Sequence, residues 1–261
     1  MTLTLIATLI ALLLPSMALV NETTRRVVCA SNLRQAGLAE AIYADDYRGS
    51  VPPSLTDLVP KLGQLSVESV EPHQVMTTAR WPMLMGGMPS NSASGQPSSK
   101  PTYVDSWVGQ GLLVSEGYLS RPDVLYCPSY NGDAEFPLQA PLWNGKPGVV
   151  VTNYAYRGNS DRDSAFGGAV SIDGLSGGNG LTHGNGSSVR RNDLSVAWVS
   201  DANGAVVSSF LQLEAVLSPT DVDVAWRQVD KLSSPSVDLA PVDDDHGSDT
   251  DGDLGFAGLT R

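Results

Sequence analysis

The first twenty residues, Met1–Val20, contain no charged side chain and are apolar almost without interruption. A helix needs about 20 apolar residues to cross roughly 30 Å of hydrocarbon. The first charged side chain is Glu22, but apolar residues keep helical spacing as far as Ile42. The pattern predicts one helix of about 40 residues and about 60 Å in length. Residues 1–20 are predicted to span a membrane, and residues 21–46 to continue as an amphipathic helix.

Two other interpretations apply to Met1–Val20. A cleaved secretory signal would use Ser16-Met17-Ala18 as its cleavage site, but no basic residue precedes Arg25. The second interpretation is a buried helix of a soluble protein, but the absence of a charge on any face of twenty residues argues against it. Arg25 and Arg26 follow the apolar run, and the positive-inside rule would keep that side in the cytoplasm.

Several motifs of the chain are similar to those of one protein family. The chain resembles the type IV pilin-like and type II secretion pseudopilin (G-like) proteins of planctomycete-type bacteria. The motifs that carry the resemblance are Leu9–Ser16, Arg25–Gln35, Tyr43–Asp46, Gly111–Leu119, Val124–Ser129, Asn153–Arg157 and the segment around His183.

The resemblance implies an α+β, pilin-like fold in which a long N-terminal helix packs on an antiparallel sheet with extensive loops. It implies a non-catalytic structural subunit of a type IV pilus-like or type II secretion-like apparatus. The partners would be copies of the chain or other pilin-like subunits, joined through the N-terminal helix. Residues 1–20 would lie in the inner membrane or in a filament core. The chain would cross the membrane once, with its body periplasmic or extracellular.

The start of the chain departs from the family pattern. Such proteins usually begin with a short basic leader ending in glycine, followed by Phe-Thr-Leu-Ile-Glu, the site of prepilin cleavage and N-terminal methylation. This sequence begins Met1-Thr-Leu-Thr-Leu5. A start codon assigned too far downstream and a paralogue that is no longer processed both explain the difference, and the sequence does not decide between them.

Composition and charge restrict the rest of the chain. A net charge of -12 argues against a nucleic-acid partner, because phosphates require clustered Lys and Arg. The 26 Gly and 17 Pro indicate a loop-rich body. We place the globular α+β body at residues 47–210, with a loop-rich insertion at 67–100, and an acidic region at 211–261.

Local patterns predict the elements of this body. A helix is expected at Ser54–Leu62 and a helical turn at Trp107–Val114, closed by a left-handed Gly117. Trp198 is expected in the sheet core. The remaining expectations are short strands at Val124–Cys127 and Val149–Tyr156, a loop at Gly167–Gly186, a hairpin of Ser188–Arg191 with Ser195–Ser200, and a further strand through Val207.

The segment from His183 to Leu194 resembles a His-to-Asp-Gly signature of the same family, with Leu194 in place of the glycine. A bulky residue is strained at positive φ, so the turn geometry is in question. A hydrogen-bonding brace is the preferred interpretation of His183, over a metal or catalytic role. The three histidines are His73, His183 and His246, and the sequence has no His-Glu-x-x-His, no Cys-x-x-Cys and no phosphate-binding Gly-Lys-Ser/Thr motif. We therefore expect no enzyme activity and no cofactor.

Two further sets of residues are candidate sites. Cys29 and Cys127 are the only cysteines, and they are either a disulfide or two buried free thiols. Asp249, Asp251 and Asp253 repeat at the spacing of a calcium loop, but the glycine and glutamate of an EF-hand are missing. Calcium binding and a solvated acidic tail are the two alternatives there.

One alternative function belongs to a different class. A secreted or membrane-tethered surface binding module would use exposed aromatic and methionine side chains for contact. The candidates for that role are Trp81, Met83, Met85, Met88 and Trp143.

Overall fold

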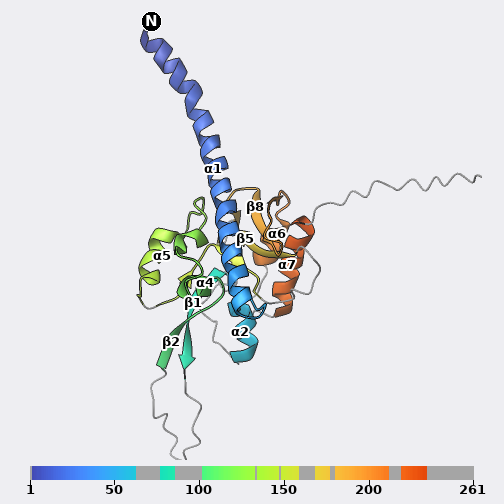
Figure 1. Ribbon diagram of the computed structural model, residues 1–261. Coiled ribbons are helices and arrows are strands. Elements are labelled where there is room, and N and C mark those ends of the chain that lie inside the picture. The colour runs from blue at the N-terminus through green and yellow to red at the C-terminus, as the bar shows by residue number, and fades with distance from the viewer. Residues whose placement is uncertain are drawn as a thin grey trace, which may run out of the picture.

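The computed structural model describes residues 2–62, 77–85, 102–132, 134–146, 148–158, 168–176, 180–211 and 219–233. It is a mixed α+β protein with a long N-terminal helix and antiparallel sheets (Figure 1). The predicted α+β class and the predicted N-terminal helix are therefore confirmed.

Helix α1 runs from Thr2 to Asp46, which is 45 residues and about 68 Å at about 1.5 Å per residue. Its N-terminal half projects away from the body, and its C-terminal half lies against it (Figure 1). Within the ranges given above, no helix has a stretch apolar and long enough for a membrane crossing. The side chains of residues 1–19 lie outside this description, so the membrane span at Met1–Val20 stays a prediction.

The face of α1 that meets the body carries apolar and small residues at helical spacing. These buried residues are Cys29, Leu33, Ala36, Gly37, Ala39 and Tyr43. Small residues let the sheet approach closely: a Cβ at Gly37 would lie 2.7 Å from Cδ of Arg190. This face belongs to the predicted amphipathic half of the helix.

The central sheet has four antiparallel strands in the order β4, β5, β8, β9. Their bounds are Tyr154–Tyr156, Ala169–Asp173, Gly186–Arg191 and Val196–Ser200. Helices α6, Ala205–Leu211, and α7, Pro219–Ser233, pack on the face opposite α1. That face is apolar, and its core includes Ile172, Val189, Val199, Phe210 and Trp226.

The sheet face toward α1 is unusually polar for a buried surface. Ser171 pairs with Arg190 across β5 and β8, whereas their neighbours Ile172 and Val189 pair on the opposite face. The buried polar side chains on the α1 side are Ser171, Asp173, Ser188 and Arg190. Because buried polar groups need partners, this face requires hydrogen bonds and ion pairs from α1 and the loops.

A second sheet has the order β2, β1, β3, with strands Thr102–Trp107, Thr78–Met85 and Val150–Val151. The other elements are α2 (Leu55–Leu62), α4 (Gly111–Ser115), η1 (Pro122–Leu125), α5 (Phe136–Trp143), β6 (Leu175–Ser176) and β7 (Gly180–Leu181). Ser54 caps α2, because its Oγ accepts a hydrogen bond from the amide of Asp57 at 3.3 Å. The predicted helix and cap are confirmed, as is the positive φ of Gly117.

The predicted hairpin around Asn192 is also confirmed, as β8 and β9. The strand predicted to follow it, through Val207, is wrong, because α6 begins there. Asp201 accepts hydrogen bonds from the amides of Val206 and Val207, both at 3.1 Å, and so caps a helix.

Three further local predictions are wrong. Val124–Cys127 is not a strand but begins in the 3₁₀ turn η1, since Pro122 fixes φ at its first position. Val149–Tyr156 is two strands in different sheets, because Thr152 bonds to Thr77 while Tyr154 pairs with Asp173. Gly167–Gly186 is not only loop: it contains β5, whose Ala169–Asp173 are all buried.

Two of the predicted regions contain regular secondary structure. Part of the insertion at 67–100 forms β1, and the acidic region at 211–261 contains α7. The amphipathic spacing of α7 places Val222, Trp226 and Val229 on its buried face. Apart from Thr77 and Leu211, the rest of both regions lies outside the described residues, and so do Asp249, Asp251 and Asp253.

Candidate functional site at the junction of helix and sheet

His183 lies at the centre of the polar contact between α1 and the central sheet. Its side chain is fully buried. Nδ1 lies 2.6 Å from the carboxylate of Glu22 on α1, and Nε2 lies 3.2 Å from Asp173 Oδ2 at the end of β5. Both ring nitrogens therefore face carboxylates, one from the helix and one from the sheet.

The two carboxylate oxygens of Asp173 have different surroundings. Asp173 Oδ1 accepts a hydrogen bond from the amide of Ser188 at 2.6 Å. Asp173 Oδ2 is close enough to His183 for an ion pair, but it receives no well-aligned hydrogen bond from the residues that the structure describes. Asp173 Oδ2 thus faces the interior and can still accept a hydrogen bond or bind a cation.

The charges around His183 change its titration. Burial lowers the pKa of the ring, but the nearby carboxylates of Asp173 and Glu22 outweigh burial, so the pKa of His183 is raised above its ordinary value. Burial raises the pKa of Glu22, while hydrogen bonds from His183, Arg26 and Ser129 outweigh it, so the pKa of Glu22 is lowered. The geometry therefore favours a charged pair between α1 and the loop before β8.

Arg26 extends this network to the surface. Its guanidinium lies 3.2 Å from Glu22, donates to the carbonyl of His183 at 3.3 Å, and sits 4.2 Å from the centre of the Trp198 ring. Trp198 is 40% exposed, so its predicted place in the core is wrong, and Val199 occupies the core instead. Trp198 lies on the α1 face of β9, at the rim that the helix only partly covers.

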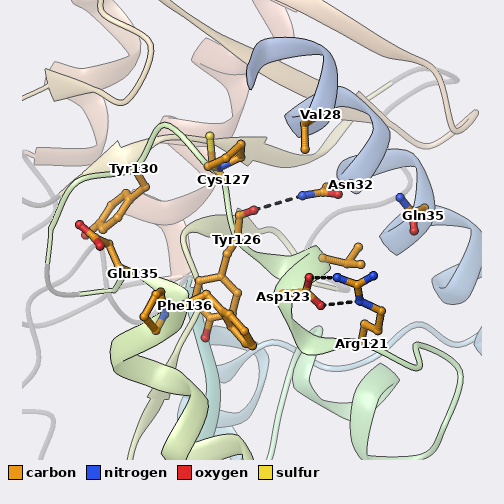
Figure 2. Close-up of a pocket in the computed structure, with 13 residues that line it drawn as sticks. Val28, Asn32, Gln35, Arg121, Asp123, Tyr126, Cys127, Tyr130, Glu135 and Phe136 are labelled. Carbon is orange, nitrogen blue, oxygen red and sulfur yellow. Dashed lines mark hydrogen bonds and ion pairs between the residues drawn. The ribbon is translucent and has the colours of Figure 1, made fainter. Parts of the chain in front are cut away.

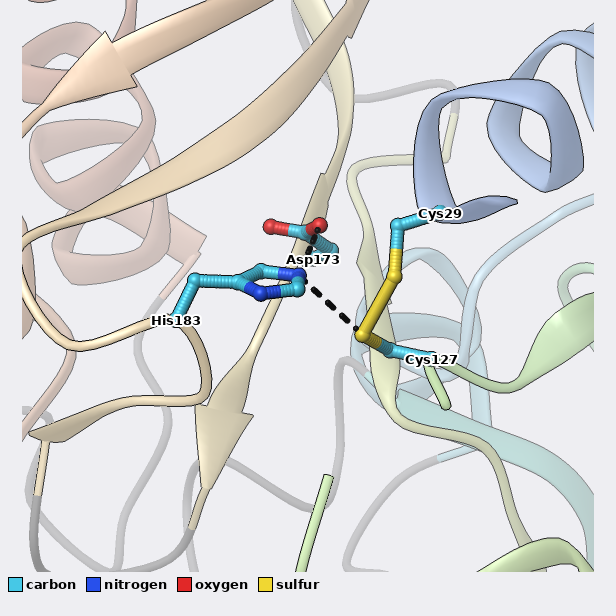
Figure 3. Close-up of side chains that lie close together, drawn as sticks. All are labelled: Cys29, Cys127, Asp173 and His183. Atoms are coloured by element: carbon cyan, nitrogen blue, oxygen red, sulfur yellow. Dashed lines mark hydrogen bonds and ion pairs between the residues drawn. A yellow bond between two sulfur atoms is a disulfide. The ribbon is translucent and has the colours of Figure 1, made fainter. Parts of the chain in front are cut away.

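The structure brings Cys29 and Cys127 together as a disulfide between α1 and the segment after η1, with their Cα atoms 5.3 Å apart. Both cysteines are buried, and Cys127 Sγ lies 3.2 Å from His183 Nε2 (Figure 3). The amide of Cys127 donates to Asn153 Oδ1 at 2.5 Å. The disulfide and the histidine network are therefore one connected site.

A second ion pair lies further along the same interface. Arg190 on β8 donates to Glu40 on α1 at 2.5 Å, and to Ser171 Oγ at 3.3 Å. Gln110 donates to the same Ser171 hydroxyl at 3.1 Å. The helix is thus attached to the sheet at two levels, by Glu22 with His183 and by Glu40 with Arg190.

A groove of about 520 Å³ runs beside the disulfide, between α1 and residues 121–137 (Figure 2). Asn32 donates to the carbonyl of Tyr126 at 3.1 Å within it, and Arg121 pairs with Asp123 at its edge. Its walls mix aromatic rings with a few polar groups.

Trp143, one of the candidate contact residues, is partly buried. Its ring stacks on Trp107 with centroids 5.0 Å apart, and its Nε1 donates to the hydroxyl of Tyr126 at 2.8 Å. Met88 and the side chains of Trp81, Met83 and Met85 lie outside the described residues. The binding-module alternative therefore has no support from Trp143.

Sequence analysis singled out His183 and the cysteines but missed Glu22, Asp173 and the Glu40–Arg190 pair. Glu22 is the first charge after the apolar run, which was a usable signal. Asp173 gave no such signal, because it lies in a segment that was predicted to be a glycine-rich loop.

Comparisons with protein-family models, with curated proteins and with solved structures give no match for the chain.

Proposed function

We propose that the chain is a pilin-like or pseudopilin-like structural subunit of a type IV pilus-like or type II secretion-like apparatus, without catalytic activity. The observation that carries the proposal is the division of α1. The part of α1 from Glu22 to Asp46 is attached to the body by a disulfide and two ion pairs, while the part before it extends beyond the body (Figure 1). An attached helix with a free extension can transmit force between a body and a helical bundle.

The length of the extension supports an anchoring role. Residues 2–20 make about 28 Å of helix, close to the roughly 30 Å of a hydrocarbon core. An apolar helix can lie either in lipid or among helices of its copies, since both bury the same surface. In this proposal residues 1–20 lie in the inner membrane or in the filament core. The chain crosses the membrane once, and the disulfide-containing body lies on the oxidising, periplasmic or extracellular side.

A second apolar stripe on α1 supports contact with other subunits. Val20, Val27 and Leu38 are exposed by 60%, 64% and 57%. They share one side of the helix, because 18 residues are about five turns and 7 residues about two. Cys29 lies half a turn from this stripe, on the face that meets the body. The helix therefore has one apolar face for its own body and another for the helix of a second copy.

Photo-crosslinking tests the proposal. The full chain is expressed in a bacterial host with a benzophenone amino acid at Val27 or Leu38, and the matched control carries it at Asp193, which is also exposed, in the β8–β9 turn. The expected result is membrane-associated adducts between copies from the two helix positions and none from the control. A chain starting at Thr23 should lose both membrane association and crosslinking. Equal crosslinking from all three positions, or a full-length chain that stays wholly soluble, would contradict the proposal.

A further inference from the structure

Four metal-ligating side chains from distant parts of the chain meet beside α1. Cys29, Cys127, Asp173 and His183 are all buried, and one ligand atom from each lies within 4.8 Å of the other three. They come from α1, the segment after η1, the end of β5 and the loop before β8 (Figure 3). In this structure the two sulfurs are joined to each other.

The orientation of His183 is that of a metal ligand. A carboxylate can only accept a hydrogen bond, so at a separation of 2.6 Å from Glu22 the Nδ1 atom carries the hydrogen. Metal binding would displace the second proton of the charged ring from Nε2, whose lone pair then points to the interior, where Cys127 Sγ and Asp173 Oδ2 each lie 3.2 Å away. Histidines that bind zinc are commonly held in this way, by a carboxylate on the other ring nitrogen.

Asp173 is oriented in a similar way. The amide of Ser188 holds Oδ1, and the buried Oδ2 points toward His183 and lacks a well-aligned hydrogen bond from the described residues. A buried carboxylate oxygen is costly unless a cation or a donor satisfies it. A metal ion between Oδ2 and Nε2 would satisfy it.

We propose that the reduced chain binds one Zn²⁺ through Cys29 Sγ, Cys127 Sγ, Asp173 Oδ2 and His183 Nε2, and that the disulfide is the metal-free form of the same site. Two thiolates, one imidazole and one carboxylate make a tetrahedral zinc set. Three anionic ligands leave the site with one net negative charge, and Arg26 lies beside it in its ion pair with Glu22. The four ligand atoms already lie within 4.8 Å of one another, and they would close around the ion to zinc distances of about 2.0 to 2.3 Å.

The two forms interconvert by thiol–disulfide exchange. An external disulfide, R–S–S–R, takes two electrons from the two cysteine thiolates: the Cys29–Cys127 bond forms, two R–S⁻ are released, and Zn²⁺ leaves without a change of oxidation state. Excess thiol reverses the exchange, and zinc binding then holds the thiolates. The site would therefore carry metal under reducing conditions and a disulfide under oxidising conditions.

The test uses the full chain in detergent, either oxidised or reduced with a phosphine under argon. Co²⁺ is titrated as a spectroscopic probe and then displaced by Zn²⁺, and native mass spectrometry counts the metal. The expected result is one tetrahedral, thiolate-bound Co²⁺ per reduced chain and none per oxidised chain. Asp173→Asn, which keeps the acceptor for Ser188, and Glu22→Gln should each weaken zinc affinity by about 10- to 100-fold. Asp193→Asn is the matched control and should leave the affinity unchanged.

Folding does not obscure the result. If the reduced chain unfolds, recovery of the native near-ultraviolet circular dichroism on adding Zn²⁺, and its loss in Asp173→Asn, supports the site. The proposal is overturned if the reduced wild type binds no metal at micromolar Zn²⁺, if it stays unfolded with Zn²⁺, or if the oxidised chain binds equally well. Affinity that is unchanged in both Asp173→Asn and Glu22→Gln also overturns it, because unspecific thiolate binding would not depend on either carboxylate.

Discussion

Arg190 on β8 and Glu40 on α1 form an ion pair across the junction of helix and sheet, 150 residues apart in the sequence. Their side chains are only 1% and 2% exposed. Breaking such a pair leaves one buried charge without compensation, whereas replacing both members by apolar residues is often neutral or stabilising. We therefore expect the pair to fix how the helix sits on the sheet more than to add net stability.

The first prediction follows from this asymmetry. Glu40→Met should lower the free energy of unfolding by about 3 kcal/mol, because Arg190 stays buried without its counter-charge. The double variant Glu40→Met with Arg190→Met should recover most of that loss. Urea unfolding of the four proteins of this double-mutant cycle measures both effects. A double variant as unstable as the sum of its single variants would contradict the expectation.

The second prediction contrasts two tryptophans. Trp226 is 0% exposed and contacts Phe210 edge-on at a centroid distance of 5.7 Å, whereas Trp198 is 40% exposed. Trp226→Ala should cost about 3 to 5 kcal/mol, since it opens a cavity in the core. Trp198→Ala should cost less than about 1 kcal/mol, as expected for a surface substitution. Chemical denaturation of both variants checks the difference, and equal losses would show that the rim of β9 is buried in solution.

The third prediction concerns Leu194, which has a φ of 66° in the turn between β8 and β9. An L-residue pays about 1 to 2 kcal/mol there, and glycine does not. Leu194→Gly should therefore raise the free energy of unfolding by about 0.5 to 1 kcal/mol, because the relief of backbone strain exceeds the cost of removing the partly buried leucine side chain.

The matched control for Leu194 is Gly117, whose φ is 84° and whose Cβ position is open. Gly117→Ala should lower stability by about 1 kcal/mol through backbone strain alone. Thermal unfolding measures both changes. If Leu194→Gly were destabilising, packing of the leucine side chain would outweigh the strain of its backbone.

The fourth prediction concerns the disulfide, which closes a separation of 98 residues. Replacing Cys29 and Cys127 by Ala should lower the free energy of unfolding by about 4 to 5 kcal/mol in metal-free buffer, because the unfolded chain gains the entropy of an open loop. Wild-type protein that is reduced in the presence of a chelator should lose a similar amount. A loss below about 2 kcal/mol in both cases would show that the hydrophobic contacts alone hold α1 in place.

The sequence alone predicted the elements that depend on local patterns. The extent of α1 followed from the spacing of apolar residues up to Ile42, and the Ser54 cap and the hairpin around Asn192 followed from turn and cap chemistry. Leu194 was marked as a departure because a turn there favours glycine. Each of these signals lies within a few residues of the structure that it predicts.

The features that only the tertiary structure decided depend on contacts between residues that are distant in the sequence. Asp173 reads as part of a loop until β5 pairs with β8, and only that pairing places its carboxylate beside His183 and the sulfur of Cys127. The burial of Val199 rather than Trp198 likewise depends on which face of the sheet α7 covers. Alternation along a strand separates two faces but does not say which one is the core. The partners of a buried charge are set by topology, because no spacing rule links residues that are 150 positions apart.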